Sequence, residues 1–245
     1  MRSRLDVELA RRGLADSRET ARRLIMAGRV RVNSRPADKP DLRVTPETDI
    51  AIVGSEPEYA SRGAYKLIAA LDRFPIEVEG RHALDVGAST GGFTDVLLKR
   101  GAAHVIALDV GYGQLAERLR TDSRVTVADR TNIRVVRHGD LPYQPDLITI
   151  DTSFISLRIV LPAVLALAAP KADIVALVKP QFEVGKGKVG KGGIVRDDAL
   201  RHEALDGILA FARSLGVEIL GSMDSPIEGA KGNREFLVAM KVRSA

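Results

Sequence analysis

"LDVGASTGGFTDVLL", residues 84–98, is the stretch that decides the fold. An apolar strand pattern runs through Asp85, three glycines follow at 87, 91 and 92, and a helical pattern then begins. Glycine lets a backbone approach a ligand closely, and the first turn of a helix offers unpaired N–H groups. The spacing Gly87-x-x-x-Gly91-Gly92 is not the G-x-G-x-x-G of dinucleotide-binding folds. The stretch therefore predicts a βα turn that binds a different small molecule.

Strand and helix patterns alternate on both sides of this turn. Helical patterns at 157–169 and 198–216 lie between apolar strand patterns, and a segment at 218–225 precedes the last strand. The predicted strands are 82–89, 104–110, 124–129, 146–153, 173–179 and 234–242. Such alternation is typical of a doubly wound α/β sheet. We therefore predict a Rossmann-like, seven-stranded domain over residues 63–245.

Acidic residues stand where the next two strands end. Asp109 follows the second predicted strand, 24 residues after Asp85, and Asp129 follows the third. The word D-x-G-x-x-x-G-G-F-T resembles the cofactor loop of methyltransferases that use S-adenosylmethionine (SAM). That resemblance implies that Asp109 holds the ribose of the cofactor and that Asp129 contacts its adenine. The candidate cofactor-binding residues are Asp85, Gly87, Ser89, Thr90, Gly91, Gly92, Phe93, Asp109 and Asp129.

Four charged residues are predicted to meet at one edge of the sheet. Asp151 and Lys179 end strands, Glu235 begins the last strand, and Lys66 lies on a helix before the sheet. Carboxyl ends of parallel strands share an edge, and an antiparallel last strand begins there. Pro180 stops the ladder after Lys179, and a buried ammonium needs a partner. A surface position is the alternative interpretation for Lys66 and Glu235.

The order Lys66, Asp151, Lys179, Glu235 resembles the catalytic tetrad of ribose 2′-O-methyltransferases. A ribose hydroxyl is a poor nucleophile at neutral pH, so a base must take its proton during attack on the SAM methyl group. A lysine serves when burial and a neighbouring cation favour its neutral form. Lys179 is the predicted base, Lys66 the neighbouring cation, and the two carboxylates orient both amines. The sulfonium activates its own methyl group, so no metal is expected.

The first forty residues have a different character. They hold eleven Lys and Arg against five Asp and Glu, whereas the remaining 205 residues sum to −1. Their pattern is helix, turn, helix and a short strand, with a closing strand at 49–54, and "RLDVELARRGLADSRETARRLIMAGRVRVNSRPADKP" resembles the S-four RNA-binding domain. We predict a small α+β RNA-binding domain at 1–54 and a linker at 55–62. The arginines expected on its outer face to bind RNA are Arg4, Arg11, Arg12, Arg18, Arg22 and Arg23.

Composition limits the class of protein. The chain has no cysteine, which excludes disulfides and cysteine-bound zinc. It has no run of 18 uncharged apolar residues and no apolar stretch of secretory type near the N-terminus. We therefore expect a cytoplasmic protein without a membrane span. A solvated arginine-rich face is the alternative to RNA binding when charge alone is considered.

Further short sequence motifs along the chain point to a family. "SRGAYKL", "DVGYGQL", "SFISL", "LVKPQFEVGKGKVGKGG" and "GNREF" resemble the TlyA family, the hemolysin-A-like ribosomal RNA methyltransferases. The resemblance implies 2′-O-methylation of cytidine in ribosomal RNA, with ribosomal subunits as partners and SAM as cofactor. "DTSFIS" departs from the expected "DLSFIS" but keeps Asp151. The chain also ends soon after the last strand, as in shorter members, which are expected to act on large-subunit RNA alone.

Two other functions are possible for such a chain, and one loop resembles a nucleotide-binding motif. A pore-forming haemolysin would need an export signal and a membrane-competent segment, and an RNA-binding protein with an inactive enzyme domain would not need an intact tetrad. The loop "GKGKVGKGG" at 185–193 is a near miss to a phosphate-binding P-loop, because Gly192 stands where Ser or Thr is required. We reject nucleotide hydrolysis. Beside the active edge the loop could close over RNA phosphates; the alternative is a mobile surface loop, and the two interpretations are compatible. The four histidines lack metal-ligand spacing and receive no role.

Overall fold

The chain folds into two compact units, which we describe separately. A computed structural model describes residues 2–26, 28–53, 58–185, 187–190 and 192–243, apart from the side chains of Arg23 and Ala230. The N-terminal unit comprises residues 1–58 and the C-terminal unit residues 59–245. Each unit has its own apolar core.

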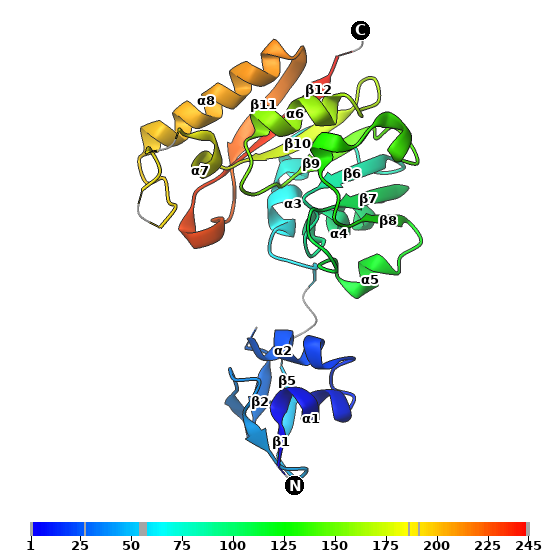
Figure 1. Cartoon of the computed structure of the whole chain (residues 1–245), viewed down its shortest axis with the longest axis vertical. Coiled ribbons are helices and arrows are strands. Elements are labelled where there is room, and N and C mark those ends of the chain that lie inside the picture. Colours follow the sequence, from blue (N-terminus) through cyan, green and yellow to red (C-terminus); the bar gives the residue numbers. More distant parts are fainter. Residues whose placement is uncertain (1, 27, 54–57, 186, 191, 244–245) are drawn as a thin grey trace. The chain divides into compact units, whose positions relative to one another are not determined.

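The N-terminal unit packs two helices against short strands (Figure 1). Leu5 and Leu9 on the first helix meet Ala21 and Ile25 on the second, because apolar residues recur at helical spacing on both. Gly13, with a φ of +70°, turns the chain between the helices. The elements are β1 Ser3–Arg4, α1 Leu5–Arg11, α2 Arg18–Met26, β2 Val30–Val32, β3 Arg35–Pro36, β4 Arg43–Val44 and β5 Ile50–Ile52. β1 pairs with β4, and β2 pairs with β3 and β5, all antiparallel.

A seven-stranded sheet forms the centre of the C-terminal unit. Its strands are β6 His82–Val86, β7 His104–Leu108, β8 Val125–Ala128, β9 Leu147–Ile150, β10 Asp173–Val178, β11 Val217–Asp224 and β12 Phe236–Val242. The order across the sheet is β11-β12-β10-β9-β6-β7-β8. The pairs β7–β8, β6–β7, β6–β9 and β9–β10 are parallel, whereas β12 runs antiparallel to β10 and β11. The start of β12 therefore lies beside the end of β10, with Phe236 opposite Val178.

Helices cover both faces of this sheet (Figure 1). The helices are α3 Ala64–Arg73, α4 Gly92–Lys99, α5 Glu117–Arg120, α6 Leu157–Leu165, α7 Pro180–Glu183 and α8 Asp198–Ser214, with 3-10 turns at Ile133–Val135, His138–Asp140 and Ala230–Gly232. Side chains of α3, α4 and α5 form the core with one face, and side chains of α6 and α8 form the core with the other. Strands buried on both faces explain the continuous apolar runs of the sequence.

The predicted doubly wound sheet is confirmed, with strands shorter than predicted. β6 ends at Val86 because Gly87 adopts a φ of +88° and turns the chain. β10 ends at Val178 because Lys179 precedes Pro180, which opens helix α7. Among the described residues, no helix has the length and apolar character needed to cross a membrane.

Candidate active site

The glycine turn after β6 brings two strand ends together. A Cβ on Gly87 would lie 2.5 Å from the carbonyl oxygen of Asp151, which follows β9. Gly91 has a φ of +96°, and a Cβ there would overlap the side chain of Leu119. Both glycines are therefore required by the packing of the protein itself. Their absent side chains keep the carboxyl edge of β6 and β9 open.

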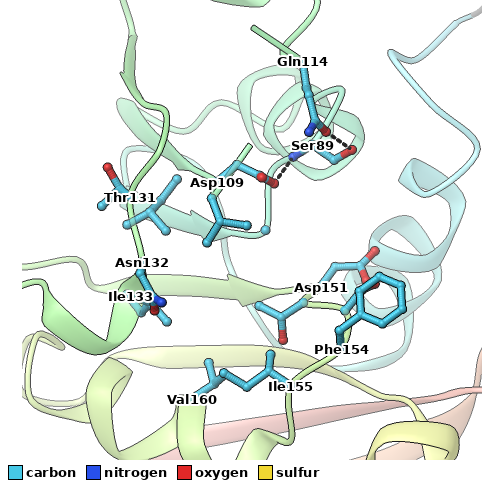
Figure 2. A pocket seen from close by; sticks show the side chains of 15 residues that line it. Ser89, Asp109, Gln114, Thr131, Asn132, Ile133, Asp151, Phe154, Ile155 and Val160 are labelled. Atoms are coloured by element: carbon cyan, nitrogen blue, oxygen red, sulfur yellow. Dashed lines mark hydrogen bonds between the residues drawn. The ribbon is translucent and has the colours of Figure 1, made fainter. Parts of the chain in front are cut away.

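A cavity of about 440 Å³ lies at this edge (Figure 2). Asp109, directly after β7, forms part of its wall, and its two carboxylate oxygens accept the N–H groups of Ser89 at 2.9 Å and Gly111 at 2.7 Å. Ser89 Oγ also contacts Gln114 Oε1 at 3.3 Å. Figure 2 shows Ile155 and Val160 across the cavity from Asp109. The cavity thus offers a fixed carboxylate on one side and apolar side chains on the other.

Two of the predicted cofactor aspartates, Asp85 and Asp129, do not line this cavity. Asp85 is fully buried beneath the turn, where its carboxylate accepts the hydroxyls of Thr94 at 2.7 Å and Thr149 at 2.9 Å. Burial raises the pKa of Asp85 to about 6, although both hydroxyls oppose that rise. Asp129 instead accepts Gly113 N–H at 3.0 Å and pairs with Arg120 at 2.9 Å.

Both side chains thus have partners within the protein, and their assignment to cofactor binding stays a prediction. Asp85 braces the turn from below, and Asp129 ties the loop after β7 to α5. The wall beyond β8 is made by the residues that follow Asp129, namely Thr131, Asn132 and Ile133.

Most of the remaining residues of the predicted cofactor loop line an adjoining cavity of about 210 Å³, whereas Gly91 lines neither cavity. Thr90, Gly92 and Phe93 contribute to it, together with Ser61 and Gly63 from the segment before α3. The two cavities share Gly87, Ser89 and Asp151. The glycine turn therefore lines both cavities.

The four predicted tetrad residues form two ion pairs. Lys66 Nζ lies 2.6 Å from Glu235 Oε2, and Lys179 Nζ lies 2.6 Å from Asp151 Oδ1. Lys179 Nζ also donates a hydrogen bond to Ser153 Oγ at 2.9 Å. Lys66, Lys179 and Glu235 are 7%, 8% and 3% exposed. Burial at this level excludes the surface interpretation of Lys66 and Glu235.

Both lysine side chains line a second large cavity, of about 370 Å³. It shares Ser153 and Phe154 with the cavity at Asp109, so the two are neighbours. Phe154 is 91% exposed and has a φ of +64°, an uncommon conformation for a bulky residue. Its ring centroid lies 5.3 Å from that of Phe182. An exposed aromatic ring therefore stands between the two cavities.

The glycine–lysine loop borders the lysine cavity, as predicted. Val189, Gly192 and Gly193 line it, while residues 186 and 191 lie outside the described part of the chain. Buried Asn233 holds the loop, because its side chain donates to Gly193 O at 3.0 Å and accepts Val195 N–H at 3.1 Å. Within the described residues, no group of three or more His, Asp or Glu side chains is arranged to hold a metal.

The arginines of the N-terminal unit surround two buried carboxylates. Asp6 pairs with Arg4 and Arg18, each at 3.0 Å, and Glu8 pairs with Arg11 and Arg12. The side chains of Arg11 and Arg18 stay 60% and 56% exposed, and Arg22 is exposed. The side chain of Arg23 lies outside the description.

Arg12 does not lie on the outside, contrary to the prediction. Its side chain is only 22% exposed and donates to the carbonyl oxygens of Thr45, Pro46 and Thr48 at 3.0, 2.9 and 2.8 Å. It thus fastens α1 to the segment between β4 and β5.

Sequence reasoning missed several residues of these cavities. Ser153, which holds the Lys179 amine, and Phe154 stand two and three positions after Asp151, so the strand end that pointed to Asp151 also pointed to them. Ser61 and Gly63 lie in the stretch SRGAYKL, which indicated the family but assigned no role to either residue. Gln114, Thr131, Asn132 and Ile133 lie in loops whose course only the folded chain reveals.

Comparison with known proteins agrees with this geometry. The FtsJ-like methyltransferase family matches residues 59–242, and the S4 domain matches residues 3–50. The fold is therefore that of a SAM-dependent methyltransferase with an N-terminal S4 domain, as predicted.

Three similar proteins illustrate the match. The 16S/23S rRNA (cytidine-2′-O)-methyltransferase TlyA of Mycobacterium tuberculosis is 51% identical over 99% of this chain and 91% of its own length. Hemolysin A of Brachyspira hyodysenteriae is 40% identical over 96% of this chain and 98% of its own. A solved structure from Streptococcus thermophilus, also under a hemolysin name, has a TM-score of 0.77 and 41% identity and covers 99% of this chain and 89% of that one.

Proposed function

The chain belongs to the FtsJ-like methyltransferase family and, within it, to the TlyA proteins, and from that premise we propose that it methylates the ribose 2′-hydroxyl of a cytidine in ribosomal RNA. One observation carries the proposal. Two buried lysines, each paired with a carboxylate, line one cavity that adjoins the cavity at Asp109. A methyl donor and a hydroxyl can therefore meet across Ser153 and Phe154, which both cavities share.

The cavity at Asp109 suits SAM, which supplies an electrophilic methyl group when bound. The Asp109 carboxylate is fixed by Ser89 and Gly111 and lies on the cavity wall, where it can accept hydrogen bonds from ribose hydroxyls. Ile133, Ile155 and Val160 offer apolar contacts for a flat ring. The adjoining hollow at Thr90 and Gly92 is left for the methionine end of the molecule.

Lys179 is the group proposed to take the proton of the ribose hydroxyl. Asp151 and Ser153 hold its amine at 2.6 and 2.9 Å, so few orientations remain open to it. Lys66, fixed by Glu235, lines the same cavity and supplies a cation near the developing alkoxide. The entry of a nucleotide excludes water from both amines and strengthens these interactions.

Phe154 is proposed to support the target nucleotide. Its exposed ring lies between the two cavities, where a base removed from its stack can lie against it. Stacking of a base on an aromatic side chain contributes about 1–3 kcal/mol. The S4 domain adds exposed arginines that attract RNA. The proposed partners are ribosomal subunits, so we place the enzyme in the cytoplasm.

Labelled SAM and purified ribosomal subunits test this function. We expect label in ribosomal RNA, at the 2′-oxygen of a cytidine, found by nuclease digestion and mass spectrometry of nucleosides. Large and small subunits are assayed separately, because the relative from M. tuberculosis is named for both RNAs. Methyl groups found only on a base or on a ribosomal protein would contradict the proposal. A pore-forming protein would show no thermal stabilisation by SAM.

Asp109→Ala tests the cofactor site. The variant loses the acceptor proposed for the ribose, so SAM affinity should fall about 10- to 100-fold, as for the loss of a charged hydrogen bond of about 1.5–3 kcal/mol. Asp206→Ala serves as the comparison, because Asp206 is an exposed residue of α8 and does not line the cavity. Calorimetry that shows equal affinity for Asp109→Ala and the wild type would remove Asp109 from the site.

A further inference from the structure

A cavity of about 460 Å³ lies beside the lysine cavity and is lined by basic side chains. Arg196, Arg201, Lys231 and Arg234 contribute to its wall, and the other lining residues are Ile194, Val195 and Gly232. No carboxylate is among these lining residues. Four cations thus line one open hollow, and their combined charge attracts an anion that enters it.

Three of the four cations are available to a ligand. Arg201 is 8% exposed and already occupied, since it pairs with Asp198 and donates to the carbonyl oxygen of Arg196 at 3.2 Å. Arg196, Lys231 and Arg234 are exposed, and in the described part of the chain their side chains form no ion pair or hydrogen bond. Arg201 therefore supports the wall, and the other three present their charge to the hollow.

The basic cavity is joined to the proposed reaction site. Lys231 lines both the basic cavity and the lysine cavity, and Arg234 directly precedes Glu235 of the tetrad. Val195, on the wall of the basic cavity, donates its N–H to Asn233, which lines the lysine cavity. A nucleotide whose ribose reaches Lys179 consequently has its neighbouring chain close to these cations.

We propose that Arg196, Lys231 and Arg234 bind backbone phosphates of the substrate RNA strand next to the target nucleotide. This inference rests on the proposed function and adds the site that holds the strand in register. Guanidinium groups match phosphate oxygens with two parallel hydrogen bonds, and Lys231 adds a point charge between the two cavities. Phosphate contacts of this kind position a nucleic acid without reading its sequence. These residues are positioning residues, because they touch the strand and not the reacting atoms.

The double variant Arg196→Gln/Arg234→Gln tests the site, with Arg201 kept because its side chain is buried. Arg213→Gln is the matched control. Arg213 is an exposed arginine of α8 and lies about 18 Å beyond Arg201 along that helix, at 1.5 Å per residue. Binding to a protein-free ribosomal RNA fragment is measured at several salt concentrations. The logarithm of the association constant falls linearly with the logarithm of the salt concentration. Each lost phosphate contact should make this negative slope shallower by about 0.7–0.9. The KM for RNA should rise, while kcat at saturating RNA and the SAM affinity stay within about twofold of wild type.

Two further variants make the outcomes decisive. Arg196→Lys/Arg234→Lys keeps the charge and should retain most of the salt slope. Lys179→Ala should lose methyl transfer and keep the full slope, so failure of the proposed function is distinguishable from failure of this site. An unchanged affinity and slope in the double glutamine variant would overturn the inference. Weaker binding to intact subunits but not to protein-free RNA would also overturn it, since the partner would then be a ribosomal protein. A fall in kcat with unchanged KM would point to distorted tetrad geometry instead.

Discussion

The N-terminal unit and the catalytic edge both pair carboxylates with cations, but they differ in how far the cations reach solvent. Asp6 and Glu8 are buried, whereas the side chains of Arg11 and Arg18 remain more than half exposed. At the edge of the sheet, Lys66 and Lys179 are as buried as Glu235.

This difference separates two uses of positive charge. A guanidinium keeps its proton at any working pH, so an exposed arginine with an internal anchor suits lasting attraction to RNA. A lysine amine can exchange its proton, and burial in a cavity places that exchange next to a substrate.

The largest effect should come from removing the buried amine. We expect Lys179→Ala to lower the single-turnover rate of methyl transfer by about 10²–10⁴-fold, the range for loss of a general base. SAM and RNA affinity should stay close to wild type, because the Lys179 side chain does not itself line the cavity at Asp109. Rapid-quench measurement with labelled SAM gives the rate. Lys188→Gln, a loop lysine paired with Glu203, is the control.

Lys179→Arg sharpens the comparison between the two kinds of cation. It keeps a positive charge beside Asp151 but cannot accept a proton, so it should be as inactive as Lys179→Ala. A turnover equal to wild type would show that the site needs only charge. The catalytic edge would then use its cations as the N-terminal unit does.

A second test separates anchoring arginines from exposed ones. Arg12→Gln should lower the free energy of unfolding of the N-terminal unit by about 1–3 kcal/mol, because Glu8 and three carbonyl oxygens lose a donor. Arg22→Gln should leave stability unchanged and reduce the salt dependence of RNA binding by about 0.7–0.9. Chemical denaturation of residues 1–58 and filter binding of the whole chain give the two values. The distinction fails if both variants change the same quantity.

The fold was predictable because its signals are local. Three strands, β6, β7 and β10, end where their apolar runs meet Gly87, Asp109 and Lys179-Pro180. Parallel strands bring such ends to one edge whatever their separation in sequence. Placing Glu235 required only that β12 run antiparallel, which its register with β10 confirms. The proximity of the four tetrad residues could therefore be predicted from the sequence.

What escaped prediction depends on side-chain direction. The sequence puts Asp85 and Asp129 at strand ends like Asp109, yet Asp85 points into the core and Asp129 toward Arg120. Arg12 resembles its neighbour Arg11 in sequence, but only Arg12 reaches the carbonyl oxygens of 45–48. A partner 33 or more residues away leaves no mark in local periodicity.

Asp6→Asn tests how firmly the arginines hold a buried carboxylate. Burial opposes the charge of Asp6, but hydrogen bonds from Arg4 and Arg18 outweigh it and lower its pKa from 3.8 to about 2. Stability from this charge is therefore fully present above about pH 4 and is lost as pH falls towards 2. We expect Asp6→Asn to lower the stability of residues 1–58 at pH 7 on the order of 1–2 kcal/mol, discounted for the exposed arginines.

The control for Asp6 is Glu19→Gln, an exposed acid in the first turn of α2. Denaturation is followed by circular dichroism at pH 3 and pH 7. On acidification, the wild type and Glu19→Gln should lose more stability than Asp6→Asn does. An equal loss in all three proteins would mean that the arginines do not stabilise the ionised form.

The smallest effect should come from Asp85, the buried carboxylate that lacks a cation. Burial raises its pKa from 3.8 to about 6, and the hydroxyls of Thr94 and Thr149 only partly offset this. The folded state then binds the proton more tightly than the unfolded chain, so stability falls as pH rises from about 4 to about 6 and stays lowered above that. This dependence has the opposite sign to that of Asp6.

Asp85→Asn removes the charge and keeps the shape, so the C-terminal unit should gain about 1 kcal/mol at pH 8 and nothing at pH 4. Thermal unfolding at the two pH values measures the gain, with Asp206→Asn on the exposed face of α8 as the control. If Asp85→Asn is no more stable than wild type at pH 8, the two hydroxyls compensate a buried carboxylate as well as two arginines do, and the contrast between the units disappears.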